Sequence, residues 1–338
     1  MTNEILSNNL YSKIAGLLQT ARQSVVRAVN QTMVYTYYEI GRMIVEDEQQ
    51  GAVRAEYGKQ VLEELSQKLT QNFGKGFSTV NLRQMRAFFQ TYSIQQTFSA
   101  ELQTLRFQLS WSHYLKLMRI EDADERNFYE IESAANNWSL KELQRQFNTA
   151  LYQRLALSRD KEGIKQLSQQ GLLIEKASDA IKDPYILEFL GLPEQPLYSE
   201  TALEQDLFDK LENFLLELGK GFTFVGRQVR FTFDEKHFHV DLVFYNRFLK
   251  CFVLIDLKIG ELTHQDLGQM QMYVNYYDRF VKLPDENKTV GIVLCRDKSE
   301  TLVEITLPEN NDQIFASRYK TVLPDKQAFI NLIGRSEE

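Results

Sequence analysis

The sequence is poor in residue types that define several special classes of protein. Its 338 residues include two cysteines, Cys251 and Cys295, six prolines and sixteen glycines. Both cysteines lie in apolar, strand-like runs, which favours buried reduced thiols of a cytoplasmic kind and excludes a disulfide scaffold or a cysteine-ligated zinc site. So few prolines and glycines exclude a fibrous or low-complexity chain.

Long apolar runs are missing as well. No run approaches the roughly 18 residues of a membrane span, and the first thirty residues lack the apolar segment of a secretory signal. The chain also has no Gly-x4-Gly-Lys phosphate loop, no glycine-rich dinucleotide turn and no Ser/His/Asp arrangement. We therefore expect a cytoplasmic protein with no membrane attachment and no nucleotide cofactor.

The net charge of −7 argues at first against a nucleic-acid partner, but the charge is unevenly distributed. Residues 1–158 carry 17 basic and 16 acidic side chains, and residues 159–338 carry 22 and 30. Between Lys68 and Arg119, seven basic residues stand against one acid, with aromatic residues among them. This composition suits contact with a phosphate backbone, although a solvated basic helix face has the same pattern.

The first half of the chain has helical periodicity throughout. Helices are predicted over 9–50, 56–72, 79–92, 110–133 and 139–157. A short glycine-containing turn separates the second from the third, and Ser78 or Thr79 caps the third. This pattern predicts a helix-turn-helix unit that reads DNA, or else ordinary helical packing. The candidate DNA-binding residues are Lys75, Arg83, Arg86 and Arg106.

The second half changes to a mixed pattern. A helix is predicted over 200–218, followed by strands over 222–233, 237–245 and 249–259 that short turns join as antiparallel hairpins. A helix over 265–281, a buried strand over 289–295, a strand near 314–323 and a helix over 325–333 complete the order. We therefore predict three regions: a helical, DNA-binding domain over 1–160, a connection over 161–198, and a mixed-sheet domain over 199–338.

Charged side chains interrupt two of the predicted strands. Asp256 and Lys258 alternate onto one face of an otherwise apolar strand, and the preceding strand contains Asp241. A hairpin would place the two aspartates side by side, where their repulsion favours a divalent cation between them. Oxygen ligands of this kind suit Mg²⁺ or Mn²⁺. The alternative is a buried Asp–Lys ion pair that fixes the strand register.

Two histidines precede the first aspartate on the same strand. His237, His239 and Asp241 alternate onto one side, so a transition-metal site is a second interpretation. With the Asp-x-Lys sequence on the next strand, we favour histidines that lie at the strand start, near DNA or solvent.

The spacing Asp-x14-Asp-x-Lys, behind a leading helix, resembles the PD-(D/E)xK nuclease superfamily. The resemblance implies a restriction-endonuclease-like αβββαβ core. It also implies that Glu204 and the Leu257 carbonyl help to bind the metal. Gln269-x3-Tyr273 is similar to the QxxxY motif of the RecB-like branch. One feature differs: Val240 stands where a proline is expected. Glu204 matches, although it could instead form a capping box with Thr201.

Longer segments resemble the bacterial YhcG-like proteins almost from end to end. They include YYEIGRMI at 37–44, GFSTVNLRQMRAFF at 76–89, KDPYILEFLGL at 182–192, DLVFYNRFLKCFVLIDLKIG at 241–260 and GQMQMYVNYY at 268–277.

These observations predict a Mg²⁺- or Mn²⁺-dependent DNA endonuclease, with roles in recombination, repair or defence against foreign DNA. The expected catalytic residues are Glu204, Asp241, Asp256, Lys258, Gln269 and Tyr273. A homodimer is expected, because cutting both strands usually needs two sites. The alternatives are an inactive nuclease fold that binds DNA or assembles a complex, and a helical domain that binds protein rather than DNA.

Overall fold

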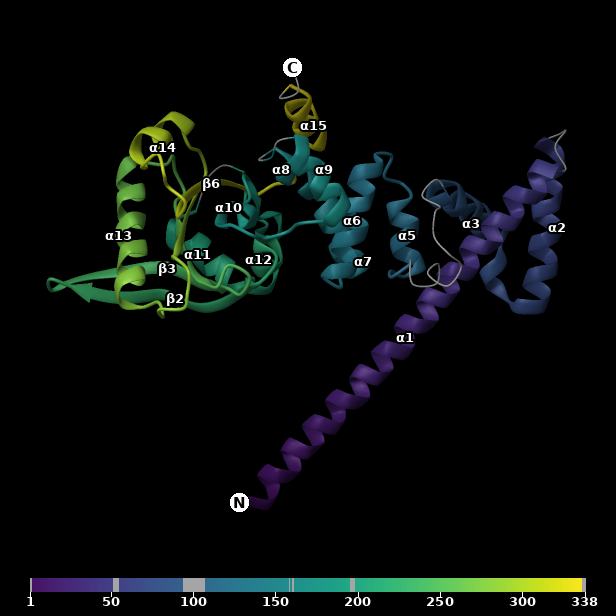
Figure 1. The fold of residues 1–338 in the computed structure, drawn as a ribbon, viewed down its shortest axis with the longest axis horizontal. Helices are drawn as coiled ribbons and strands as arrows, with labels where there is room; N and C mark the ends of the chain where they lie inside the picture. Colours follow the sequence, from purple (N-terminus) through teal and green to yellow (C-terminus); the bar gives the residue numbers. More distant parts are fainter. Residues whose placement is uncertain are drawn as a thin grey trace. The chain divides into compact units, whose positions relative to one another are not determined.

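The computed structural model describes residues 2–50, 55–93, 107–157, 159, 161–194 and 198–335 (Figure 1). Its internal contacts divide the chain into two units, Met1–Gln144 and Arg145–Glu338. No helix among the described residues is long and apolar enough to span a membrane.

The first unit is helical in all of its regular elements among the described residues. They are α1 (Thr2–Gln50), α2 (Ala55–Phe73), the 3₁₀ turn η1 (Lys75–Phe77), α3 (Thr79–Tyr92), α5 (Trp111–Leu117), α6 (Ala123–Ala135) and the start of α7 (Leu140–Asn148). The single helix predicted over 110–133 is wrong. A turn divides it, and the Asp122 carboxylate caps α6 by accepting the Glu125 amide hydrogen at 2.7 Å.

Helices α1 and α3 pack closely in this unit. Leu82 and Met85 of α3 form a buried cluster with Ile44 of α1 and Leu62 of α2. Gly41 makes the approach possible, because a Cβ atom there would collide with the main-chain oxygen of Met85. Ser78 caps α3, as expected, by accepting the amide hydrogen of Asn81.

Replacing Gly41 with alanine should therefore destabilise the first unit. We expect a loss of about 2 kcal/mol, because the new methyl group meets main-chain atoms that cannot rotate away. Gly16→Ala on the same helix is the matched control, since nothing lies within 4 Å of its Cβ position. Thermal unfolding of both variants measures the difference. Equal melting temperatures would show that α1 and α3 do not pack in this way.

The second unit contains a six-stranded sheet and its covering helices. Its helices are α8 (Leu151–Ala156), α9 (Lys161–Gln170), α10 (Ala177–Ala180), the 3₁₀ turn η3 (Glu188–Leu190), α11 (Glu200–Asp209), α12 (Leu211–Leu218), α13 (His264–Phe280), α14 (Glu300–Thr306) and α15 (Lys326–Arg335). Its strands are β1 (Tyr185–Ile186), β2 (Phe222–Phe233), β3 (Lys236–Asn246), β4 (Cys251–Leu257), β5 (Val290–Cys295) and β6 (Ile314–Lys320).

The sheet is mixed and has the strand order β1-β6-β5-β4-β3-β2. Strands β2, β3 and β4 are antiparallel neighbours, whereas β4, β5, β6 and β1 run parallel. Both predicted hairpins are confirmed. The fold is therefore a helical region followed by a mixed sheet with helices, as expected; a DNA-reading helix-turn-helix stays a prediction.

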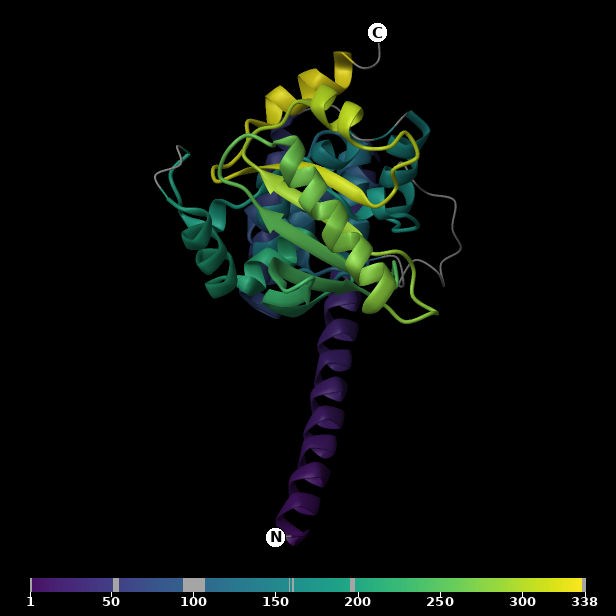
Figure 2. The same cartoon turned by 90° about the vertical axis from the view of Figure 1, so that its left-hand side faces the viewer.

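Helices cover both faces of the sheet. Helices α11 and α12 supply Leu203, Leu207 and Phe214 to a core that includes Leu242 and Ile255. Helix α13 crosses the other face, where it forms a second core (Figures 1 and 2). This second core includes Met270, Val274, Val243, Leu254 and Val293. The centre of the sheet is therefore closed to water on both sides.

The β2–β3 hairpin extends beyond the rest of the sheet. Strand β3 pairs with β4 only over Leu242–Asn246, whereas its residues from Lys236 to Val240 pair with β2 alone. We call this two-stranded part, residues 229–240, the arm; its tip projects past α13 in Figure 1. Asp241 lies where the arm leaves the sheet.

Several predicted elements of the second half have different limits. The helix expected over 200–218 is broken at Lys210 into α11 and α12, and that expected over 139–157 is broken at Ala150, which has a positive φ of 53°. Helices α9, α10 and α14 and strand β1 were not predicted. The segment 161–198, expected to be a connection, contributes β1 to the sheet and Leu187 to its core.

Candidate functional site

A buried acid lies near the end of β4. Asp256 is 3% exposed, and Lys258 follows directly after the strand with its Nζ atom 2.8 Å from Asp256 Oδ2. Apart from this ion pair, the buried Oδ2 atom has no hydrogen-bond donor among the described residues. This oxygen is a place for a cation, and the Lys258 ammonium is the cation beside it.

Asp241 lies beside Asp256 because the β3–β4 pairing ends there. Leu242 pairs with Ile255 as the last pair of this ladder. Beyond it, the main-chain N–H of Leu257, two residues after Ile255, donates to Asp241 Oδ2 at 2.8 Å. The side chain of Asp241 thus replaces a main-chain acceptor. Burial, and then the charge of Asp241, raise the pKa of Asp256 from 3.8 to about 7, while Lys258 acts in the opposite direction.

Glu204 approaches the same place from helix α11. Ser199 caps this helix by accepting the amide hydrogen of Ala202, so the capping box with Thr201 is wrong and Glu204 is available for another role. Its side chain is largely buried, and its pKa is raised by burial, with a further contribution from Asp241. The amide of Gln228 links the two acids, since its Nε2 atom donates to Glu204 Oε2 at 2.7 Å and to Asp241 Oδ1 at 3.0 Å.

Helix α13 carries the predicted Gln–Tyr pair on one face. Gln269 Nε2 donates to Tyr273 Oη at 2.5 Å. Tyr273 is buried, and burial first and the Asp256 charge second raise its pKa to about 12. The phenol therefore keeps its proton at neutral pH and lies within the electrostatic influence of Asp256.

Lys258 carries a positive charge in this environment. Burial, the largest single influence, would lower its pKa, but the neighbouring carboxylates of Asp256, Glu200 and Asp241 together raise it. Asp266, which forms the N-terminal capping box of α13 with Thr263, lies 4.0 Å from the Lys258 ammonium. Lys258 is thus a positively charged side chain fixed near Asp256 and Asp266, rather than a neutral base.

Gln228 and Asp266 were not predicted as site residues from the sequence. A Thr-x-x-Asp pattern at 263–266 predicts the cap, but not its proximity to Lys258. Nothing in the sequence around Gln228 distinguishes it from other polar strand residues. Its position depends on a local backbone conformation that only the folded strand shows.

The other predicted site residues lie elsewhere or act differently. His237 contacts Arg230 and Thr232 on the arm, and His239 is exposed. Among the described residues, no group of three or more His, Cys, Asp or Glu side chains is arranged to hold a metal, which supports neither the histidine interpretation nor Glu204 as a third ligand beside Asp241 and Asp256. Leu257 contributes its main-chain N–H, as described above, while a metal role for its carbonyl stays a prediction.

The basic residues of the first unit differ in their availability. Lys75 on η1 and Arg83 on α3 are exposed. Arg86 instead forms an ion pair with Glu48 of α1, with 2.7 Å between Nη1 and Oε1. Arg106 lies outside the described residues.

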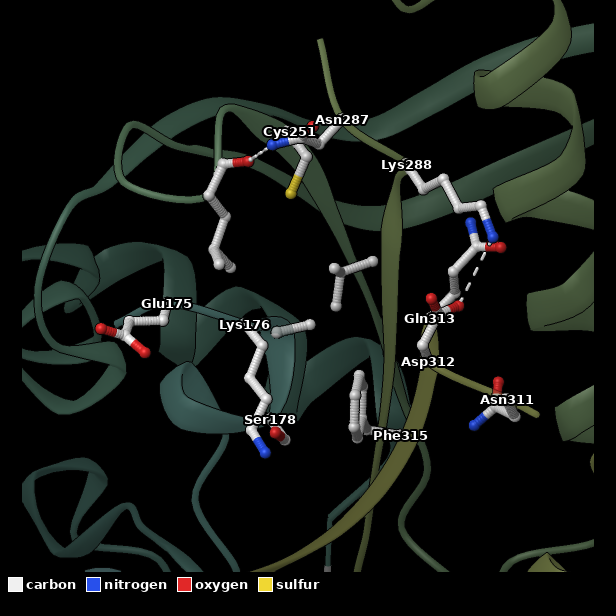
Figure 3. A pocket seen from close by; sticks show the side chains of 13 residues that line it. Glu175, Lys176, Ser178, Cys251, Asn287, Lys288, Asn311, Asp312, Gln313 and Phe315 are labelled. Atoms are coloured by element: carbon white, nitrogen blue, oxygen red, sulfur yellow. Dashed lines mark hydrogen bonds and ion pairs between the residues drawn. The ribbon is translucent and has the colours of Figure 1, made fainter. Parts of the chain in front are cut away.

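A pocket of about 460 Å³ lies at the opposite ends of the central strands (Figure 3). Cys251 and Val290, the first residues of β4 and β5, form part of its wall. Its amide side chains are already committed: Asn287 donates to the Leu249 carbonyl, and Gln313 donates to Asp278. The pocket shows no catalytic arrangement, and Asp256 lies near the other end of β4.

The residues around Asp241 and Asp256 fit a hard divalent cation. Mg²⁺ is commonly bound by one or two carboxylates, with water and substrate phosphates as its remaining ligands. Two adjacent carboxylates, one of them buried and paired with the Lys258 ammonium, provide that donor set without a third acid. Glu204 lies behind Gln228 and is in a position to support them.

The comparisons with known proteins define the class. Residues 178–331 match the model of the YhcG PDDEXK nuclease domain, and residues 13–154 match that of the DUF1016 N-terminal domain. A protein of Escherichia coli (strain K12) named "Putative nuclease YhcG" is 40% identical over 353 aligned residues, which cover 97% of this chain and 94% of that protein. The chain therefore belongs to the YhcG family of PDDEXK-type nucleases, as the sequence predicted.

One solved structure also matches. A repair endonuclease from Pyrococcus abyssi is 15% identical to this chain, with a TM-score of 0.25 and coverage of 39% of this chain and 50% of that one.

The raised pKa of Asp256 predicts how the stability of the metal-free protein depends on pH. The folded state holds the Asp256 proton up to about pH 7, whereas the unfolded chain releases it near 3.8, so stability falls as pH rises between these values. Asp256→Asn removes this contribution. In EDTA, the melting temperature of the wild type should therefore fall more between pH 5 and pH 8 than that of the variant. Equal falls would contradict the raised pKa.

Proposed function

We propose that the protein is a Mg²⁺- or Mn²⁺-dependent DNA endonuclease. The observation that carries this proposal is the pair Asp241 and Asp256, held side by side with the Lys258 cation at the end of a central strand. Asp256 is buried next to a second carboxylate with one ammonium group beside it, and a divalent cation would offset the repulsion between the two acids. Membership of a nuclease family supports a phosphodiester as the substrate.

A bound metal ion would supply a water of lowered pKa and would neutralise charge on the phosphate. In the proposed reaction, the water oxygen forms a bond to phosphorus as the bond to the leaving sugar oxygen breaks. The water's proton passes to solvent, and the leaving oxygen gains a proton. Asp241 and Asp256 hold the site, and the Lys258 ammonium orients the attacking water and offsets the growing negative charge. Gln269 and Tyr273 support this arrangement from α13.

The arm offers a route for DNA toward these residues. Arg230 and His237 are within 3.0 Å of each other on its exposed surface, and His239 lies two residues before Asp241. Phe231 faces the opposite side, where it stacks on Tyr276 of α13 with 4.2 Å between ring centroids. The arm therefore has one packed apolar side and one polar side with cationic groups, which suits a phosphate backbone.

In this proposal the helical unit positions the protein on DNA, and two copies cut the two strands. Purified protein should cleave at least one of linear duplex, nicked, branched and single-stranded DNA with Mg²⁺, and cleavage should stop in EDTA. Metal-independent cleavage, or none of any substrate, would contradict the proposal. Binding without cleavage would instead indicate an inactive nuclease fold.

Arg83 tests the role of the helical unit. Arg83→Ala should weaken binding to DNA of any sequence and reduce the slope of log affinity against log salt concentration by about 1, because one phosphate contact is lost. Fluorescence anisotropy at several salt concentrations, in EDTA, measures both quantities. Lys13→Ala is a control from the same unit, at an exposed lysine of α1. An unchanged slope would favour a helical unit that binds protein.

A further inference from the structure

Gln228 has a backbone conformation that is unusual for its place in a strand. Its φ angle is +47°, in the left-handed region, although the residues on both sides belong to β2. For a residue other than glycine, this conformation costs roughly 1–2 kcal/mol. It lies opposite Asp241, between the pairs Arg227–Leu242 and Val229–Val240.

The side chain of Gln228 uses both hydrogens of its amide on the acids of the site. One goes to Glu204 Oε2 and the other to Asp241 Oδ1. The second oxygen of Asp241 accepts the Leu257 amide hydrogen, so each oxygen of this carboxylate has one fixed donor. Each oxygen keeps a lone pair, which leaves Asp241 oriented but still able to bind a cation.

Packing does not account for this arrangement. Gln228 is exposed, so neither burial nor a core contact requires a left-handed residue there. Its contacts are directed instead at two carboxylates from different elements, α11 and β3. Without the amide, like charges on Glu204 and Asp241 would face each other with no donor between them.

We propose that Gln228 is a positioning residue of the metal site. It holds Glu204 and Asp241 in the orientation in which Asp241 binds the cation and Glu204 supports it. This inference rests on the proposed metal-dependent function. Gln228 acts through the two acids rather than on the metal directly. Groups that orient metal ligands in this way typically change metal affinity 10–100-fold when they are removed.

The test is Mn²⁺ binding by isothermal titration calorimetry on the full-length protein without DNA. Gln228→Gly removes the amide but accepts the left-handed backbone without strain, and Gln228→Ala is the second variant. Both should bind Mn²⁺ about 10-fold more weakly than the wild type. Gln327→Ala is the matched control. Gln327 donates to Asn331 within α15, a helix that supplies no residue to the site, and its loss should leave the affinity unchanged.

A purely structural role would lower the melting temperature without changing the affinity of the folded protein, so both quantities are measured. In a Glu204→Ala background, the effect of Gln228→Gly on affinity should shrink, because one of its two partners is already gone. If Gln228→Gly bound Mn²⁺ as tightly as the wild type, the positioning role of Gln228 would be overturned, but the proposed function would not. Absence of Mn²⁺ binding by the wild type would overturn the proposed function together with it.

Discussion

Asp256→Asn should reduce DNA cleavage on the order of 10³-fold, equivalent to about 4 kcal/mol of transition-state stabilisation. The amide has the shape of the carboxylate but no negative charge, so the site loses a buried anionic ligand. Folding should not suffer, because burying a neutral amide costs less than burying a charge. Initial cleavage rates at saturating Mg²⁺ measure the effect.

A control for this variant is available on the other side of the domain. Asp312→Asn makes the same chemical change at an exposed aspartate whose partner, Lys288, is also exposed. Its cleavage rate should equal that of the wild type. If Asp256→Asn cleaved as fast as Asp312→Asn, Asp256 would have no part in the reaction.

Lys258→Met should reduce cleavage on the order of 10²-fold while leaving Mn²⁺ binding in place. Methionine keeps much of the side-chain length but has no charge, so the attacking water and the developing phosphate charge lose their cation. Because Asp256 raises the pKa of Lys258, the lysine is charged at neutral pH and acts as a cation rather than as a base.

The cleavage rate and the Mn²⁺ affinity should respond differently to this substitution. Single-turnover rates should fall in Lys258→Met, whereas Mn²⁺ affinity should stay the same or rise, since a competing positive charge beside Asp256 is gone. Lys258→Arg keeps the charge and should restore part of the rate. Lys288→Met at an exposed position is the control for the substitution itself. A full rate in Lys258→Met would show that the cation is dispensable.

The sequence was sufficient to predict the strands that carry Asp241 and Asp256. Charged residues in apolar strands are costly, so Asp241, Asp256 and Lys258 stood out, and short turns at 234–236 and around Asn246 implied that their strands are neighbours. The structure places the two aspartates side by side as those turns require. The Gln–Tyr spacing on α13 likewise predicted two side chains on one face, and the two are in contact.

Features that depend on tertiary contacts could not be predicted from the sequence. Nothing in the sequence indicates the left-handed backbone of Gln228, because glycine or asparagine is the residue expected in that conformation. The ion pair between Arg86 and Glu48 joins residues 38 positions apart, so a count of basic residues overstates the free charge of α3. Strand β1 has two residues, too few for any periodicity, and it forms because β6 offers it a free edge.

Metal-dependent cleavage as proposed requires Asp241 and Asp256 to bind the cation together. Anomalous diffraction from a Mn²⁺-soaked crystal of this protein measures where the cation binds. We expect a single strong peak within about 2–2.5 Å of a carboxylate oxygen from each aspartate, and its loss in Asp256→Asn. A peak that involves neither aspartate, or one that persists in the variant, would contradict it.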